Sequence, residues 1–95
     1  MAKKEINGLS QSIIESYSSQ LLEVSKNIDQ DIQKAAELII NNSGKVVISG
    51  LGKSGLIGQK IVATLCSTGT RSVYMHAAEA IHGDLGIYNP GDPTI

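Results

Sequence analysis

The fold is decided by one stretch of the sequence, Val46-Val47-Ile48-Ser49-Gly50-Leu51-Gly52-Lys53-Ser54-Gly55-Leu56-Ile57-Gly58. A run of β-branched apolar residues stops at a glycine, four glycines then fall within nine residues, and a helical pattern follows. Such a run predicts a buried parallel strand that turns tightly into a helix whose free N–H groups face an anion. We therefore expect a ligand site where this strand ends and the helix begins.

The composition is that of a globular domain, because 41% of the 95 residues are hydrophobic and 18% are charged. The net charge of −1 argues against a basic nucleic-acid-binding face. No apolar run approaches the ~18–20 residues of a membrane span, so we expect no membrane partner. The single cysteine, Cys66, excludes an internal disulfide. Together these features favour a cytoplasmic protein.

The first 43 residues predict a helical region. Apolar residues recur at steps of three and four, which is the period of a helix: Leu9, Ile13, Tyr17, Leu21, Val24, Ile28, Ile32, Ala35 and Ile39. We expect one helix over Leu9–Asn27 and a second over Gln30–Asn41, with the Asp29 carboxylate as its cap. Regular opposite charges beside the stripe are lacking, so packing on the domain or on a partner subunit is favoured over a coiled coil.

Residues 44–95 predict an α/β domain. Two short strands, over Lys45–Ser49 and Arg71–Met75, flank a helix over Ser54–Ser67 that Gly69 ends, which makes a right-handed βαβ unit. That helix is expected to pack through Ile57, Ile61, Thr64 and Leu65.

The end of the chain predicts a short helix, turns and a further strand. The short helix is expected over Ala77–Ile81, the turns at His82–Gly86 and at Asn89–Pro93, and the strand from Thr94 onward. Two strands do not make a stable parallel sheet, so we expect a domain that is incomplete or is completed by another chain.

The glycine stretch has three interpretations. Gly50-x-Gly52-x-x-Gly55 matches the dinucleotide fingerprint, which also needs an acidic residue at the end of the second strand, where His76 stands. A P-loop needs a glycine where Val47 stands. The third interpretation is a small phosphorylated ligand, approached by the glycine backbone, with Lys53 as a cation and Ser54 as a helix cap or a phosphate donor. The alternative for Lys53 is a solvated loop lysine.

Both histidines lie in the segment His76–Asp84, which follows the second strand. Neither zinc-protease spacing is present, so the spacing is weak evidence for a metal. His82 suits general acid or base catalysis, although simple packing of both histidines is an equal alternative. Cys66 is expected in the core and not as a nucleophile.

Three separated motifs resemble the sugar isomerase (SIS) domain, and more narrowly the arabinose 5-phosphate isomerases. They are Gly50-Leu51-Gly52-Lys53-Ser54-Gly55-x-x-Gly58, then Ser67-Thr68-Gly69-Thr70, then His76-x-x-Glu79-Ala80-x-His82-Gly83-Asp84-Leu85-Gly86. The resemblance covers Gly44–Ile95 and implies a flavodoxin-like α/β/α fold with a parallel sheet. It also implies interconversion of D-arabinose 5-phosphate and D-ribulose 5-phosphate for synthesis of the Kdo sugar of lipopolysaccharide or capsule.

The resemblance further implies residue roles. Lys53 matches a catalytic lysine, and His82 a substrate contact that we also expect to be catalytic; His76 matches a position linked to a zinc that catalysis does not require. The other expected substrate-binding residues are Gly52, Ser54, Gly69, Thr70 and Glu79. Such enzymes need no cofactor, are typically homotetramers and build sites from more than one subunit. Ala77-Ala78 replaces the usual Pro-Gly, which leaves the direction of His76 open.

The family's serine-rich phosphate loop follows the third strand, and no such loop occurs in these 95 residues. We therefore expect this chain alone to be inactive. The alternative function is a non-catalytic SIS module that senses a sugar phosphate, and an NAD-binding Rossmann domain is a weaker one.

Overall fold

The computed structural model describes residues 6–95, and residues 1–5 of the expected N-terminal helical region lie outside this range. The chain divides into two compact units, Met1–Ala35 and Ala36–Ile95. No helix of the described part has the length and apolar character that crossing a membrane requires.

The first unit contains helix α2 (Leu9–Ser25) and the beginning of helix α3 (Asp29–Ile40). Both predicted helices are therefore confirmed, with ends that differ by one or two residues. Asp29 is already the first helical residue, so its expected role as the cap is wrong; it lies in the first turn, where a carboxylate favours the helix dipole. No residue of α2 is buried, and its apolar side chains, among them Tyr17 at 70% exposure, remain open.

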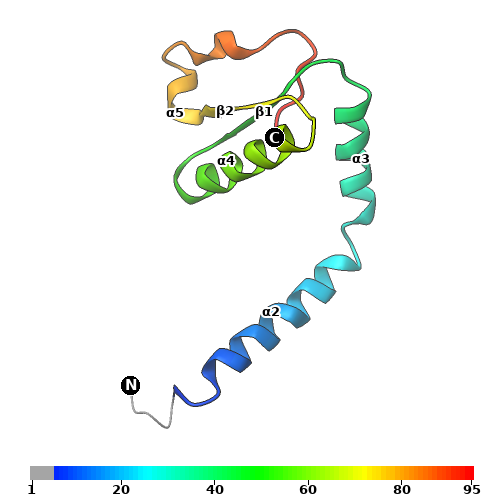
Figure 1. The fold of residues 1–95 in the computed structure, drawn as a ribbon, viewed down its shortest axis with the longest axis vertical. Helices are drawn as coiled ribbons and strands as arrows, with labels where there is room; N and C mark the ends of the chain where they lie inside the picture. The colour runs from blue at the N-terminus through cyan, green and yellow to red at the C-terminus, as the bar shows by residue number, and fades with distance from the viewer. Residues whose placement is uncertain (1–5) are drawn as a thin grey trace. The chain divides into compact units, whose positions relative to one another are not determined.

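The second unit is built on two parallel strands. Strand β1 (Val46–Gly50) pairs with strand β2 (Ser72–His76), and the register places Val46 beside Ser72 and Gly50 beside His76. Helix α4 (Gly52–Ser67) connects them and packs against both, as Figure 1 shows. This is the predicted βαβ unit, with each strand one residue later than expected.

The start of a third strand is confirmed on the free edge of β1. Thr94 forms a parallel bridge with Val47. Val47 N–H donates to the Pro93 carbonyl, Ile95 N–H to the Val47 carbonyl, and Ser49 N–H to the Ile95 carbonyl, each over 2.9 Å. The spatial order is thus β2, β1, third strand, which is how a flavodoxin-like sheet begins.

The core of this unit lies in β1. Val46, Val47 and Ile48 are at most 2% exposed, so both faces of the strand are covered as predicted. Met75 and Ser72 of β2 are also buried.

The face of α4 that packs on the strands agrees with the prediction only at Leu65, which is half-buried, whereas Ile57, Ile61 and Thr64 are exposed. Its buried residues are Gly55 and Gly58, whereas Ile57 is 63% exposed and Ile61 39%. A Cβ on Gly58 would lie 3.0 Å from Cγ2 of Ile48, so the missing side chain is what lets the helix approach the strand. Cys66 is likewise exposed and not in the core, and its thiol donates to the Ser72 carbonyl over 3.3 Å.

Helix α5 (Ala77–Ala80) follows β2 directly, and a 3-10 helix, η1 (Asp84–Ile87), occupies the predicted irregular segment. Gly69 has a φ of 95° and ends α4 as expected, because a left-handed residue stops the helix. The turn before the third strand contains Gly91, with a φ of 90°.

Candidate functional site

The candidate site is the edge of the sheet where β1 and β2 both end. Gly50 and His76 are paired in register, so the turn into α4 and the start of α5 leave the sheet side by side. In open α/β sheets, ligands bind at the carboxyl ends of the strands, next to the point where the strand order reverses. Here that point lies between β1 and the third strand, directly beside the glycine turn.

Gly52 and Gly50 are needed in this turn for two different physical reasons. Gly52 has a φ of 56° and open space where a side chain would be, so it supplies the left-handed turn and leaves its backbone accessible. Gly50 has a different role from the one expected. A Cβ there would lie 3.1 Å from the backbone of Gly55, so Gly50 serves close packing between the strand end and α4 and not approach to a ligand.

Tyr74 holds this turn from the neighbouring strand, and sequence reasoning missed it. Its Oη donates a hydrogen bond of 2.8 Å to the Gly50 carbonyl, and its ring lies beside Gly58. The available signal was its alternation with His76 on β2, which places both on one face of the strand.

The N-terminus of α4 carries uncompensated positive charge. Leu51 precedes the helix and provides no side-chain cap, and no acidic residue lies in the first turn. Because α4 begins at Gly52, Ser54 is its third residue, and the expectation that it caps the helix is wrong. Its hydroxyl instead donates to the Leu51 carbonyl over 2.8 Å. Lys53 is exposed, lies in the same turn and has no ion-pair partner within residues 6–95.

This arrangement favours an anion. The first N–H groups of a helix have no partners in the helix, and the dipole places partial positive charge on them. A lysine at that end adds repulsion instead of relieving it. A bound phosphate or oxyanion would satisfy both the N–H groups and Lys53.

His76 caps α5. Its Nδ1 accepts a hydrogen bond of 3.2 Å from Ala78 N–H, and its ring is exposed. Ala77 is the first helical residue, a position that proline also tolerates, so the replacement of Pro-Gly by Ala77-Ala78 keeps a helical start.

The residues do not fit a complete metal site in this chain. No group of three His, Cys, Asp or Glu side chains converges anywhere in residues 6–95. His76 offers a metal only its Nε2 atom, because Nδ1 is engaged by Ala78. Structural zinc takes four ligands, so His76 alone does not make such a site.

Glu79 and His82 follow His76 and are both exposed. Glu79 lies in the first turn of α5, and its carbonyl accepts the His82 N–H over 3.0 Å. The segment that carries these two residues therefore leaves the sheet at the same edge as the turn that carries Lys53.

Gly69 and Thr70 are not brought to this edge. They lie between the end of α4 and the beginning of β2, at the amino ends of the strands. A strand of five residues separates the two edges by about 13–16 Å. Within one copy of the chain, these residues and Lys53 face opposite edges of the sheet.

The SIS domain model matches residues 39–95. The chain belongs to the SIS domain family. Arabinose 5-phosphate isomerase KpsF of Escherichia coli O6:H1 is 51% identical over 79 residues, which are 82% of this chain and 24% of that protein. Membership of this family excludes the alternative of an NAD-binding Rossmann domain. Such a domain also needs an acidic residue at the end of its second strand, and β2 ends at His76.

Solved structures also match the fold. An E. coli CFT073 protein in complex with arabinose 5-phosphate matches 99% of this chain and 50% of its own, with a TM-score of 0.85 and 33% identity. A Bacteroides fragilis protein whose description connects it with phosphosugar isomerisation and capsule formation matches with a TM-score of 0.69 and 40% identity, over 86% of this chain and 47% of its own. The chain thus spans about half of these structures and about a quarter of the curated relative.

Proposed function

We propose that the complete protein interconverts D-arabinose 5-phosphate and D-ribulose 5-phosphate. The single observation that carries this proposal is the uncapped N-terminus of α4 with Lys53, set beside the paired residues Gly50 and His76 in a SIS domain. The similarity to KpsF and to the E. coli CFT073 complex with arabinose 5-phosphate supports this substrate over other sugar phosphates.

The reaction moves one proton between two adjacent carbons through an enediol. A base removes the proton from C2 of the aldose, and the carbonyl oxygen at C1 gains negative charge that a nearby cation stabilises. The proton then returns to C1 as the hydroxyl at C2 becomes the ketone, so no redox or group-transfer cofactor is needed. We assign Lys53 to the developing oxyanion, and His82 to proton exchange with or orientation of a sugar hydroxyl.

The remaining expected contacts complete the binding site. The N–H groups of Gly52, Lys53 and Ser54 bind an oxygen of the ligand, and Glu79 binds a sugar hydroxyl. Gly69 and Thr70 can contact only a ligand bound at a neighbouring copy, because they lie at the opposite edge of their own sheet. This supports a homo-oligomer, which we propose to be a tetramer. His76 contributes at most one ligand to a zinc that the reaction does not use.

We further propose that the enzyme is cytoplasmic and supplies the pathway to Kdo in lipopolysaccharide or capsule. The similarity to the B. fragilis protein involved in capsule formation supports this context.

The test is a coupled isomerase assay of the full-length protein with arabinose 5-phosphate. Lys53→Ala should lower kcat/KM by about 100-fold or more, the usual effect of removing one oxyanion-stabilising group. Lys60→Ala is the matched control, since Lys60 is also exposed on α4 but lies two turns further along the helix. Equal rates for wild type and Lys53→Ala would remove Lys53 from the mechanism.

The same experiment separates the alternative of a non-catalytic module. Saturable binding of arabinose 5-phosphate by the wild type without turnover would favour a sensor over an enzyme.

A further inference from the structure

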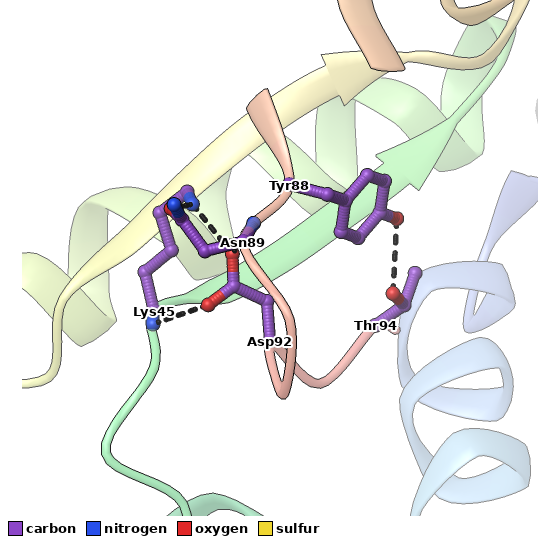
Figure 2. A network of polar contacts seen from close by, with 5 residues as sticks. All are labelled: Lys45, Tyr88, Asn89, Asp92 and Thr94. Carbon is purple, nitrogen blue, oxygen red and sulfur yellow. Dashed lines mark hydrogen bonds and ion pairs between the residues drawn. The ribbon is translucent and has the colours of Figure 1, made fainter. Parts of the chain in front are cut away.

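A polar network around a largely buried ion pair ties the beginning of β1 to the turn before the third strand, as Figure 2 shows. The Asp92 side chain is 1% exposed and that of Lys45 13%, although the two residues are 47 positions apart. Charged side chains are buried this far only when they are paired and fully hydrogen-bonded.

The carboxylate of Asp92 is satisfied on both oxygens. Oδ1 accepts the Lys45 N–H over 3.1 Å, and Oδ2 accepts both the Lys45 Nζ over 2.5 Å and the Asn89 N–H over 2.8 Å. Lys45 Nζ also donates to Oδ1 of Asn89 over 2.8 Å. A Cβ on Gly44 would collide with this carboxylate, so the glycine leaves room for it.

The network fixes the position of the strand that follows it. Asp92 immediately precedes Pro93, whose carbonyl accepts the first hydrogen bond from β1, and Ile95 then makes the next two. Beside the network, the Thr94 hydroxyl donates to Tyr88 Oη over 2.9 Å. A shift of the third strand by one residue would break the Asp92 contacts and turn its side chains to the other face of the sheet.

We propose that Lys45 and Asp92 are positioning residues for ligand binding, because they set the register of the third strand, whose end at Ile95 pairs with Ser49 next to the glycine turn. That end borders the glycine turn at the point where the strand order reverses, the usual ligand position in such sheets. Lys45 itself lies about 16 Å of strand away from Gly50, so the pair acts through the strand and does not touch the ligand. This inference rests on the proposed function for its kinetic test only.

The test uses Asp92→Asn in the full-length protein, with Glu23→Gln as the matched control. Glu23 pairs with Lys26 over 2.9 Å, but both side chains are more than 60% exposed, so this ion pair is a surface one. The first readout is hydrogen exchange at the backbone amides of Val47, Ser49 and Ile95. We expect at least tenfold faster exchange at these three amides in Asp92→Asn, with Val46 N–H, which donates to Arg71 on the β2 side, unchanged.

The second readout is the division between KM and kcat for arabinose 5-phosphate. A displaced end of the third strand weakens ligand binding and raises KM. We expect at least a fivefold rise in KM for Asp92→Asn and none for Glu23→Gln. A pair that merely stabilises the fold would instead lower the active fraction, which reduces the apparent kcat and leaves KM unchanged. An unchanged KM, or faster exchange spread evenly over both edges of β1, would overturn the proposal.

A second variant covers the case in which Asp92→Asn does not accumulate as folded protein. Lys45→Met removes only the Nζ contacts and keeps the backbone N–H bond to Asp92, and the same two readouts apply with the same criteria. If the wild type shows no isomerase activity, the proposed function fails, and the exchange measurement alone decides whether the pair sets the register.

Discussion

The contact between Gly55 and Tyr74 yields a quantitative prediction about stability. A Cβ on Gly55 would lie 2.5 Å from Tyr74 Oη and 3.3 Å from the carbonyl group of Gly50. Gly55→Ala gains up to about 1 kcal/mol from helix propensity. It costs about 1–3 kcal/mol for overpacking and about 0.5–1.5 kcal/mol if the Tyr74 hydrogen bond to Gly50 is displaced. We expect a net loss of about 1–3 kcal/mol in the free energy of unfolding.

A double-mutant cycle with Tyr74→Phe isolates the cause. Tyr74→Phe alone should cost about 0.5–1.5 kcal/mol, because it removes the hydrogen bond to Gly50. In the double variant the hydroxyl that would clash is already gone, so the loss should be smaller than the sum of the single losses by about 1–2 kcal/mol.

Urea denaturation of the full-length protein and its variants provides the measurement. Gly86→Ala is the control, since a Cβ there meets open space and Gly86 does not have a positive φ; it should be neutral or slightly stabilising. Losses for Gly55→Ala and Tyr74→Phe that add within about 0.5 kcal/mol would refute a clash at the tyrosine hydroxyl.

Three further predictions concern the site and the buried ion pair. His82→Gln should lower kcat about 100-fold with a smaller change in KM, as expected for a lost proton-transfer group; steady-state kinetics at one pH checks this, and a rate within twofold of wild type would contradict it. The hydrogen bond from Lys45 holds the pKa of Asp92 below its ordinary value of 3.8, so the stabilisation it gives is complete above pH 3.8 and is lost as the pH falls through the lower folded-state pKa. Thermal unfolding at pH 7 and pH 3 should therefore show a gap between wild type and Asp92→Asn that shrinks at the lower pH, and a constant gap would count against the pairing. The 95-residue chain on its own should show no isomerase turnover in the coupled assay, because it spans about half of the related structures; measurable turnover would sink this expectation.

The strand–helix–strand order was predictable because it depends on local patterns. The β-branched run Val46–Ile48 indicated a doubly covered strand, and all three side chains are buried. Gly69 and the turn before Thr94 were predictable for the same reason, since left-handed residues and turn chemistry act over a few positions.

Apart from Leu65, which is half-buried, the packing face of α4 was not predictable from hydrophobic periodicity. That method selects large apolar side chains, whereas α4 approaches the sheet through Gly55 and Gly58, where side chains are absent. Ile57 and Ile61 are exposed for the same reason, because they do not lie on the face of α4 that contains Gly55 and Gly58.

Long-range polar contacts also could not be predicted from the sequence. Lys45 and Asp92 each had an adequate local explanation, as the start of a strand and as a turn residue. Only the parallel addition of the third strand to β1 brings them together. In the candidate site, the sequence placed Lys53 after the first strand and His76 after the second, but the separation of Gly69 and Thr70 from these residues required the register of β1 and β2.

The position of β1 in the middle of the sheet has a consequence for synthesis of the protein. Within residues 6–95, its second edge is paired only by residues 93–95, which leave the ribosome 43 residues or more after Gly50. At about 5–20 residues per second, a nascent chain carries this apolar strand with an open edge for about 2–9 s. An unpaired apolar edge is a template for intermolecular pairing, so this interval is when a chaperone is most needed. Slower translation through residues 51–92 should lengthen the exposure and lower the soluble yield.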